Sequence, residues 1–413
     1  MPKKPFRSLL LTRHMPSPTR GGSSMRNHLT AAALAGFGPT GVFCLRIGEA
    51  TPRLEPVPGL AVCEQHHRGM SLTSVLWAVL RSPLSIPGAF ERLTFHHDIA
   101  AALDRTLESF QPDLVVCVEP WLHAYLPVIR KHGCTVALDL HNIECRLYAD
   151  VARTAFTPRR RLSAAILRRV ACGLEPAFCA EADQIWTCSS VDADAVRTLY
   201  APRGGIHVIP SGIDASYYAS VEGGRGDQGP PAVLYCANFA YAPNAEAADA
   251  LLHLFPRLQA ARQDCRLILA GANPTQNMLR SVGDAVTVTG MVSDMRPVLS
   301  TPNAVLVVPL LHGSGTRLKI LEAFTCGIPV VSTAKGMEGI DAVHGIHALI
   351  ADGEESIVEQ VLRLWKEPAL RQQLTANARR LLEERHSPHS VREALAKALA
   401  DCDAQAPSVD SVA

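Results

Sequence analysis

The chain has 413 residues, a formal net charge of +1 and 47% hydrophobic residues. This length favours two domains, and the hydrophobic content supports packed cores and argues against a disordered chain. A net charge this close to zero gives no general attraction to nucleic acid, so we expect no nucleic-acid partner. No apolar run approaches the roughly 18 residues that a membrane-spanning helix requires.

The 12 cysteines are scattered, and none forms a C-x-x-C pair. This pattern favours reduced thiols over a disulfide framework or a zinc site, and we expect a cytoplasmic protein. The histidine pairs at 66–67 and 96–97 are poor metal ligands because adjacent side chains diverge on a helix or strand, so we predict no metal site. Near the start of the chain, a short apolar run is followed at once by Arg13 and His14, which indicates a first strand rather than a signal peptide.

Short apolar or β-branched runs alternate with helical segments, which is typical of parallel sheets with crossover helices. The strands expected in the first half are 8–12, 41–45, 60–63, 113–118, 135–138, 184–188 and 206–209. Those expected in the second half are 232–236, 266–270, 286–289, 304–309, 329–332 and 347–350. Helical stretches include 25–36, 99–110, 245–263 and 356–366. We therefore predict an α/β protein with two Rossmann-like, doubly wound domains that face a cleft.

A loop rich in glycine and charge, from Val221 to Pro231, separates the two sets of strands and is expected to be an interdomain linker. We assign residues 1–215 to the first domain and residues 216–385 to the second. Residues 402–413 are mostly small and polar, so we predict a disordered tail. Ligands of such domains bind at the carboxyl ends of the parallel strands.

The most informative stretch is 313–339, which reads GSGTRLKILEAFTCGIPVVSTAKGMEG. A loop of small residues opens a helix whose first turn carries two cations, and a carboxylate follows one turn deeper; these residues are Gly313, Ser314, Gly315, Arg317, Lys319 and Glu322. Unpaired N–H groups and the helix dipole favour an anion there. Cations suit a phosphate and a carboxylate suits sugar hydroxyls, so the pattern predicts a nucleotide-sugar pocket. The alternative is a surface ion pair between Lys319 and Glu322, worth about 0.2–0.5 kcal/mol.

Other strand-end loops of the second half carry polar groups. Asn238, Tyr241 and Asn244 follow the strand 232–236, and GMVSD follows 286–289, where exposed backbone near Val292 is suited to a base edge. Each loop alone is explained equally well as a simple connection. Loops that face the same crevice favour a ligand site.

In the first half, Gly21 and Gly22 lie between the first strand and a helix, where they let backbone approach a ligand, with Ser23 and Ser24 as helix caps. The alternative is a plain flexible loop. The segment DLHNIE follows the strand at 135, and we select His141 as a hydrogen-bond partner for a sugar or phosphate oxygen. The alternative for His141 is a structural histidine.

The stretch 157–170 places five arginines around an apolar stripe: Arg159, Arg160, Arg161, Arg168 and Arg169. A basic amphipathic helix of this kind can lie on an anionic membrane surface. The alternative is an ordinary solvated helix face. The sequence leaves both interpretations open.

With GSGTRLKILEAFTCGIPVVST, GMVSDMRPVL, PNAEAADAL and DLHNIE, the chain resembles the retaining glycosyltransferases of family 4, which have the GT-B fold. It is most similar to the branch with the signature Gly-Gly-Gly-Thr-Arg-x-Lys-x-Leu-Glu-Ala, found in bacterial polysaccharide and exopolysaccharide assembly. The resemblance extends from Gly21 to about His386 and is strongest over 290–340. It implies a nucleotide-diphosphate-sugar co-substrate and no other cofactor. It also implies a glycan or polyprenyl-linked acceptor, and a final helix at 386–401 that crosses back to the first domain.

The resemblance also implies roles for individual residues. It implies that Glu322 binds the ribose hydroxyls, that the backbone of Gly315 and Thr316 faces the diphosphate and the sugar, and that Arg317 and Lys319 neutralise the leaving diphosphate. It also implies that the region of Val292 borders the base. In the first domain, it implies that Gly22 approaches the phosphates and His141 contacts the donor sugar.

Two departures from the family pattern stand out. Ser314 occupies the first position of the family's Glu-x7-Glu pair, and the loop ANFAYAPNA lacks the usual Arg and Lys. The diphosphate charge therefore depends chiefly on Arg317 and Lys319. The rival functions are another GT-B enzyme, such as a nucleotide-sugar epimerase, or a catalytically silent scaffold that binds sugar nucleotides.

Overall fold

The computed structural model describes residues 5–19, 21–47, 59–69, 81, 85–154, 158–221, 229–313 and 315–405. The chain groups into two compact units. Unit 1 comprises Met1–Cys145, Ala165–Pro210 and Pro388–Ala413, and unit 2 comprises Arg146–Ala164 and Ser211–Ser387. The division therefore falls five residues before the boundary expected after residue 215, and it assigns 146–164 to unit 2. Part of the expected linker, residues 222–228, lies outside the described residues.

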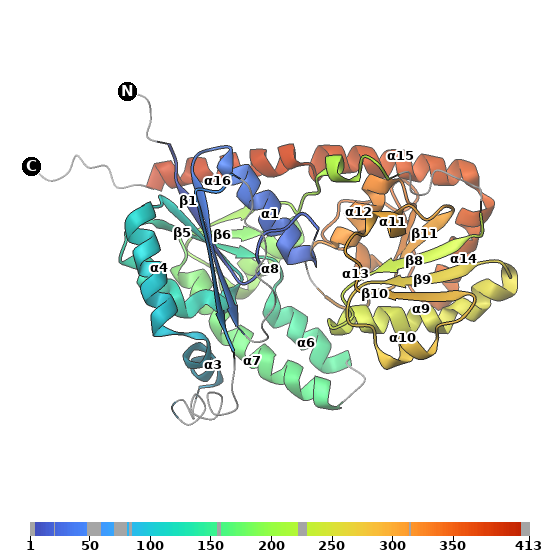
Figure 1. Ribbon diagram of the computed structural model, residues 1–413, viewed down its shortest axis with the longest axis horizontal. Coiled ribbons are helices and arrows are strands. Elements are labelled where there is room, and N and C mark those ends of the chain that lie inside the picture. The colour runs from blue at the N-terminus through green and yellow to red at the C-terminus, as the bar shows by residue number, and fades with distance from the viewer. Residues whose placement is uncertain are drawn as a thin grey trace, which may run out of the picture. The chain divides into compact units, whose positions relative to one another are not determined.

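Unit 1 contains a seven-stranded parallel sheet in the order β3-β2-β1-β4-β5-β6-β7 (Figure 1). Its strands are β1 Ser8–Thr12, β2 Thr40–Ile47, β3 Val62–Arg68, β4 Leu114–Val118, β5 Thr135–Leu140, β6 Gln184–Thr187 and β7 Gly205–Val208. Strand β1 pairs with both β2 and β4, so the strand order reverses there, as in a doubly wound fold. This reversal brings the carboxyl ends of β1 and β4 together.

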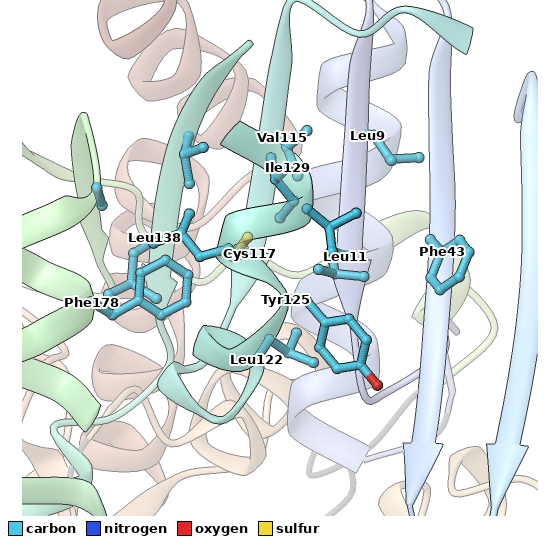
Figure 2. Packing of buried hydrophobic residues seen from close by; sticks show 14 of the residues in the cluster. Leu9, Leu11, Phe43, Val115, Cys117, Leu122, Tyr125, Ile129, Leu138 and Phe178 are labelled. Atoms are coloured by element: carbon cyan, nitrogen blue, oxygen red, sulfur yellow. The ribbon is translucent and has the colours of Figure 1, made fainter. Parts of the chain in front are cut away.

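Helices cover both faces of this sheet. Those of unit 1 are α1 Gly21–Ala35, α3 Ile86–Thr94, α4 His97–Phe110, η1 Pro120–Tyr125, α5 Leu126–Arg130, most of α7 Pro158–Glu181, α8 Ser190–Tyr200 and α16 Pro388–Gln405, whereas α6 Glu144–Thr154 and the start of α7 fall largely in unit 2. Successive side chains of a strand point to opposite faces. Leu9 and Leu11 therefore pack in the core shown in Figure 2, whereas Leu10 packs in a second core with Leu395 of α16. Burial in these cores explains why β1 consists of apolar residues flanked by Ser8 and Thr12.

The last helix packs against unit 1, where it lies beside α1 (Figure 1). Val391, Leu395 and Ala398 of α16 contribute to the second core. The helix continues to Gln405, so the predicted disordered tail is wrong at its start, over residues 402–405. Apolar residues spaced three and four apart along α16 explain this packing. Residues 406–413 lie outside the described residues.

Unit 2 contains a six-stranded parallel sheet in the order β10-β9-β8-β11-β12-β13. Its strands are β8 Ala232–Cys236, β9 Arg266–Ala270, β10 Val286–Gly290, β11 Ala304–Val308, β12 Val330–Ser332 and β13 Leu349–Ile350. Its helices are η2 Ala215–Tyr218, α9 Ala242–Ala261, α10 Gln276–Arg280, α11 Arg296–Leu299, α12 Leu318–Cys326, α13 Ala334–Met337, α14 Glu354–Lys366 and α15 Pro368–Arg385. At the end of β9, a Cβ on Gly271 would meet the Ala237 carbonyl oxygen at 1.8 Å, so only glycine fits there.

One expectation about the thiols is wrong. Cys145 and Cys172 form a disulfide that joins α6 to α7, whereas the scattered cysteines predict reduced thiols throughout. The other ten cysteines are free, and most of them are buried. Within the described ranges, no helix is both long and apolar enough to span a bilayer. The same ranges contain no group of three or more His, Cys, Asp or Glu side chains arranged to hold a metal ion.

Candidate functional site

In unit 2, the loop after β11 leads into α12 and wraps around the side chain of Arg317. Gly313 and Gly315 adopt positive φ angles of 115° and 73°, which favour glycine. Arg317 lies at the N-cap of α12, one residue before the first turn, and its Nη1 donates to the Gly315 carbonyl at 2.6 Å. A Cβ on Gly313 would lie 2.9 Å from Arg317 Nη2. The small residues of this loop therefore leave room for the guanidinium. Ser314 lies outside the described residues.

Lys319, in the first turn of α12, is held by two uncharged groups. Its Nζ lies 3.0 Å from the Tyr235 hydroxyl and 2.9 Å from Asn244 Oδ1, and the Tyr235 hydroxyl donates to the same Asn244 oxygen at 3.0 Å. The ammonium also lies 4.1 Å from the centre of the Tyr235 ring, in a cation–π contact. Burial lowers the pKa of Lys319 to about 7. Lys319 and Glu322 are half-buried and hold separate partners, and no ion pair joins them among the described residues, so the alternative of a surface ion pair is wrong.

Glu322 lies one turn further along α12 and accepts a hydrogen bond from the Tyr218 hydroxyl at 2.8 Å. Burial raises the pKa of Glu322, although this hydrogen bond and the charge of Lys319 oppose the increase. The Thr316 hydroxyl nearby is buried and has no hydrogen-bond partner among the described residues. Such an orphaned polar atom is uncommon in a native protein unless a ligand or water satisfies it. The head of α12 therefore combines a cation, a carboxylate and a buried hydroxyl that no described residue satisfies.

Asn238 and Val292, which the sequence also selects in unit 2, lie in the loops that follow β8 and β10. Asn238, after β8, accepts hydrogen bonds from Ala240 N at 3.1 Å and from Asn273 Nδ2 at 2.9 Å, so its side chain ties two strand-end loops together. Val292 is half-buried and follows β10. Strand β8 is the direct neighbour of β11 in the sheet. This pairing explains why Asn244 can reach Lys319, as the strand-end rule predicts.

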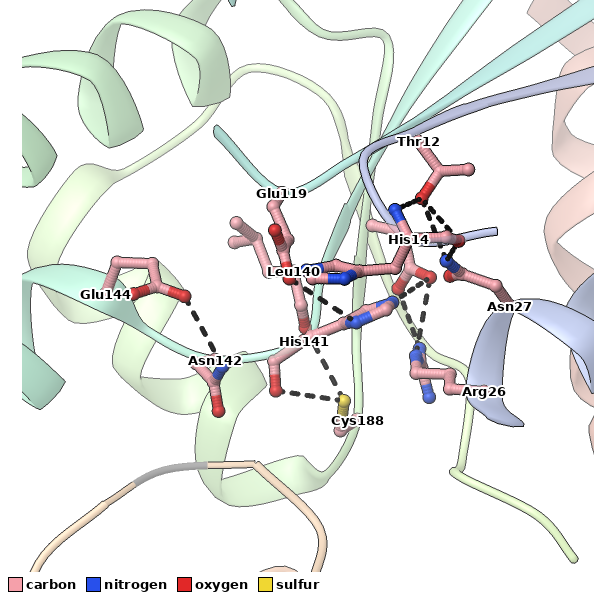
Figure 3. A network of polar contacts seen from close by, with 11 residues as sticks. Thr12, His14, Arg26, Asn27, Glu119, Leu140, His141, Asn142, Glu144 and Cys188 are labelled. Atoms are coloured by element: carbon pink, nitrogen blue, oxygen red, sulfur yellow. Dashed lines mark hydrogen bonds and ion pairs between the residues drawn. The ribbon is translucent and has the colours of Figure 1, made fainter. Parts of the chain in front are cut away.

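In unit 1, a buried polar network lies at the carboxyl ends of β4 and β5 (Figure 3). Arg26 donates to Asp139 Oδ1 at 2.7 Å and to the Ile209 carbonyl at 2.9 Å. His141 places Nε2 3.3 Å from Asp139 Oδ2 and Nδ1 3.8 Å from Glu119 Oε1. Burial would raise the pKa of Asp139, but the charges of Arg26 and His141 hold it well below its usual value. His141 thus lies between two carboxylates.

A second group of carboxylates lies where α6 begins. Glu175 of α7 accepts hydrogen bonds from the backbone N–H groups of Glu144 at 2.6 Å and Cys145 at 2.9 Å. It therefore satisfies donors that the first turn of a helix leaves free. Burial raises the pKa of Glu144, and the charges of Glu119 and Glu175 raise it further. Asn142 donates to Glu144 Oε1 at 3.3 Å, so DLHNIE forms a connected polar segment rather than four independent site residues.

The glycine pair near the N-terminus differs from the prediction. Helix α1 begins at Gly21, so Gly21 and Gly22 form its first turn rather than a loop. Ser23 and Ser24 lie inside the helix instead of capping it. Gly21 has φ 63°, and apart from its own chain neighbours and the backbone of its helix, no atom of the described residues lies within 4 Å of the position that its Cβ would occupy. The low helix propensity of glycine explains why the sequence pattern placed the start four residues later.

Five further residues belong to these clusters and were not selected from the sequence: Arg26, Glu119, Glu175, Tyr218 and Tyr235. Glu119 follows β4 directly, so the strand-end rule that selected His141 also applies to it. Tyr235 lies within the apolar run of β8, and only the packing of α12 against that strand gives its hydroxyl a role. Tyr218 and Arg26 likewise depend on contacts between segments far apart in the sequence.

Two family models match the chain. Residues 21–212 match the model described as "Glycosyl transferase 4-like domain", and residues 230–367 match "Glycosyl transferases group 1". A curated protein from Klebsiella pneumoniae, "Uncharacterized 44.6 kDa protein in cps region", is 28% identical over 95 residues. That match covers 23% of this chain and 24% of the relative, so the chain matches about a quarter of the relative's length.

Solved structures of low sequence identity share the fold. Sucrose-phosphate synthase from Thermosynechococcus elongatus is 17% identical with a TM-score of 0.73, over 96% of this chain and 99% of that chain. Anabaena Alr3699/HepE in complex with UDP and glucose is 15% identical with a TM-score of 0.64, over 96% and 100%. The trehalose 6-phosphate synthase from Burkholderia multivorans is 14% identical with a TM-score of 0.63, over 97% and 98%. The two parallel-sheet units therefore form the GT-B fold.

Proposed function

We propose a specific reaction for this chain, which matches glycosyl transferase family models in both of its domains. In this proposal it moves a sugar, with retention of configuration, from a nucleotide-diphosphate-sugar to a glycan or lipid-linked acceptor. We place it in the family 4 branch of polysaccharide assembly, on the residues GSGTRLKILEA and on the relative from a cps region. The reaction needs no metal ion in this proposal.

The observation that carries the proposal is the head of α12. Lys319 offers an ammonium, Glu322 a carboxylate held by Tyr218, and Thr316 a buried hydroxyl with no partner among the described residues. In the proposal, Arg317 and Lys319 bind the diphosphate and Glu322 binds the ribose hydroxyls. The backbone of Gly313, Gly315 and Thr316 faces the phosphates and sugar, with Ser314 in the same loop. The solved complexes of Alr3699/HepE with UDP and with UDP-glucose support a uridine nucleotide as the first candidate donor.

In the proposed step, the bond between the anomeric carbon and the diphosphate oxygen breaks while the acceptor oxygen bonds to the same face. The acceptor hydroxyl gives its proton to the departing diphosphate oxygen, so the step needs no separate base. Negative charge grows on the diphosphate, and preorganised cations and N–H groups stabilise that charge. His141 hydrogen-bonds the transferred sugar, and Gly22, Asn238 and Val292 complete the donor contacts as the family resemblance implies.

We also propose that the acceptor is presented at a membrane surface. The five arginines of α7 are exposed, and so are Leu162 (64%) and Ile166 (47%) between them. Arg159, Leu162, Ile166 and Arg169 follow one another at spacings of three and four, so they share one helix face. Cations beside exposed apolar groups suit the anionic face of a bilayer. A polyprenyl-linked acceptor fits this location.

The donor is identified by a thermal-shift screen against UDP, GDP, ADP and their sugar conjugates, without and with magnesium. A ligand that binds only the folded state raises the midpoint temperature of unfolding by mass action. We expect one diphosphate series to raise the midpoint equally in both conditions. If none raises it, the proposed donor pocket is wrong.

The selected donor is then incubated with and without acceptor extract, and the configuration of the product is read by NMR. The proposal predicts transfer only with acceptor and with the donor's configuration. Conversion of the donor without acceptor identifies an epimerase instead. Binding without any turnover identifies a silent scaffold. Equal turnover by the wild type and the Arg317→Ala/Lys319→Ala variant would overturn the assignment of the diphosphate site.

A further inference from the structure

Glu119 has a backbone conformation that side chains normally avoid. It follows the last residue of β4, and its φ of 70° and ψ of 152° lie in a region occupied almost only by glycine. The chain nevertheless has a glutamate there, followed by Pro120 at the start of η1. Such strain persists only where the surrounding structure enforces it, and it is concentrated at functional sites.

The strained backbone places a charged group in the interior. The Glu119 side chain is only 8% exposed, and its Oε1 lies 3.8 Å from His141 Nδ1. On the other edge of the same ring, Nε2 lies 3.3 Å from Asp139 Oδ2, and Asp139 is itself held by Arg26 (Figure 3). The imidazole is therefore contacted by one carboxylate on each edge, which restricts its rotation about the Cβ–Cγ bond.

The backbone at this position does not need a glutamate. The Glu119 N–H donates to the Asp139 carbonyl at 2.9 Å, a bond between adjacent strands that glycine would form equally well. Glycine would also adopt this φ without strain. The path of the chain therefore does not require the glutamate side chain, whose carboxylate lies beside His141 and also acts on the charge of His14.

We propose that Glu119 is a positioning residue, which orients the His141 imidazole toward the sugar that is transferred. The inference rests on the proposed contact between His141 and that sugar. The chain accepts a strained residue at 119 because a carboxylate at that position holds the ring in one orientation.

The test compares Glu119→Gly with Glu119→Ala. Both variants lose the carboxylate, but only glycine removes the backbone strain. We expect Glu119→Gly to melt about 2–4 °C above Glu119→Ala, since relief of strain stabilises the fold. We expect both variants to lose at least tenfold in kcat while the donor affinity of unit 2 stays within twofold. Wild-type kcat in the glycine variant would overturn the inference.

A second readout does not depend on turnover. The ring ¹⁵N resonances of His141 report its hydrogen bonds, and Glu119→Gln keeps the size of the side chain while removing its charge. We expect the Nδ1 resonance to shift in Glu119→Gln and Glu119→Asp to restore part of the wild-type signal. Unchanged His141 resonances in Glu119→Gln would refute the positioning role. If the wild type transfers no sugar under any condition, the proposed function fails, and this measurement still decides whether Glu119 orients His141.

Discussion

The protonation of Lys319 depends on its surroundings, so in the proposed function it is coupled to binding of the donor diphosphate. Tyr235 and Asn244 offer it neutral oxygens, and burial lowers its pKa to about 7, with Arg317 lowering it and Cys236 and Glu322 raising it. A bound diphosphate would place further negative charge beside the ammonium group. The ammonium form is therefore favoured by the donor, and donor binding takes up a proton when the pH exceeds the pKa of the free site.

The first prediction is that donor affinity decreases as the pH rises. Above about pH 7 the free site is increasingly neutral at Lys319 while the complex keeps the proton, so the Kd increases up to tenfold per pH unit until the pKa of the complex is reached. Calorimetric titration with the donor chosen by the screen measures this between about pH 6 and 9. Lys319→Arg stays charged throughout this range and should show a flat profile. A flat profile in the wild type would contradict the prediction.

The same pKa change predicts the stability of Lys319→Met. The folded-state pKa of about 7 lies below the usual lysine value of 10.5, so burial of Lys319 penalises folding most below pH 7. We expect Lys319→Met to melt at a higher temperature than the wild type near neutral pH. This gain should diminish as the pH rises toward the usual lysine range. A gain that grows with pH would contradict the sign of this pKa change.

The residues that sequence reasoning selected and those that it missed differ in a physical way. Glu322 and Lys319 share one helix, so their spacing is visible in the sequence. Their partners Tyr218 and Tyr235 lie 104 and 84 residues away, and only the packed structure brings them together. The rule that ligands bind at the carboxyl ends of strands could have selected Glu119, which follows β4. Nothing in the sequence indicates its unusual backbone conformation.

At the scale of elements, the loop 313–316 depends on glycine at its first position. We predict that Gly313→Ala lowers donor affinity about tenfold or more, because the new Cβ would lie 2.9 Å from Arg317 Nη2 and 3.5 Å from the Tyr241 hydroxyl. The φ of 115° also disfavours alanine, at a cost of about 1–3 kcal/mol. Calorimetric titration of the donor and thermal melts measure the two effects.

Gly345→Ala is the matched control for the loop. Gly345 also has a positive φ, of 74°, but apart from its chain neighbours no atom in the described part of the chain lies within 4 Å of its hypothetical Cβ. We expect this variant to lose stability for the same backbone reason while keeping wild-type donor affinity. If both variants weaken the donor equally, the effect of Gly313 is a general loss of stability and not a property of the loop.

For helix α7, we predict binding to vesicles that contain anionic lipid. Replacing Arg159 and Arg169 by glutamine should weaken vesicle binding about 30-fold, since each basic residue near such a surface contributes about 1 kcal/mol. Co-sedimentation with anionic and with zwitterionic vesicles measures this. The control replaces Arg257 and Arg280, two exposed arginines of α9 and α10. If the wild-type protein does not bind anionic vesicles, the arginine-rich face of α7 is an ordinary solvated helix face.

All thirteen expected strands occur, and their ends differ by at most two residues except in β3, which ends at Arg68 and not at residue 63. Strands of a parallel sheet are buried on both faces, so they are short apolar runs that a sequence reveals directly. Helix ends were harder to predict, because α1 begins with two glycines and α9 begins with a residue before Pro243. Local propensity misplaces such ends when packing overrides it.

At the scale of the whole molecule, the order of elements predicted two doubly wound sheets, and the GT-B fold is confirmed. The disulfide between Cys145 and Cys172 was not predictable, because thiol pairing depends on the approach of α6 and α7. The resemblance to family 4 predicted that α16 belongs to unit 1, whereas the apolar spacing of the helix predicts only that one face is buried. Fold and family thus follow from the chain, whereas donor and acceptor need measurement.

The most direct test of the account is a calorimetric titration of the selected nucleotide-sugar into the wild type and into the Arg317→Ala/Lys319→Ala variant. Each charge-assisted hydrogen bond to the diphosphate contributes about 1.5–3 kcal/mol. We predict that the wild type binds the donor and that the variant, with an unchanged far-UV circular dichroism spectrum, binds it at least about 100-fold more weakly. Equal affinity in the two proteins would contradict the assignment of the donor site to the head of α12.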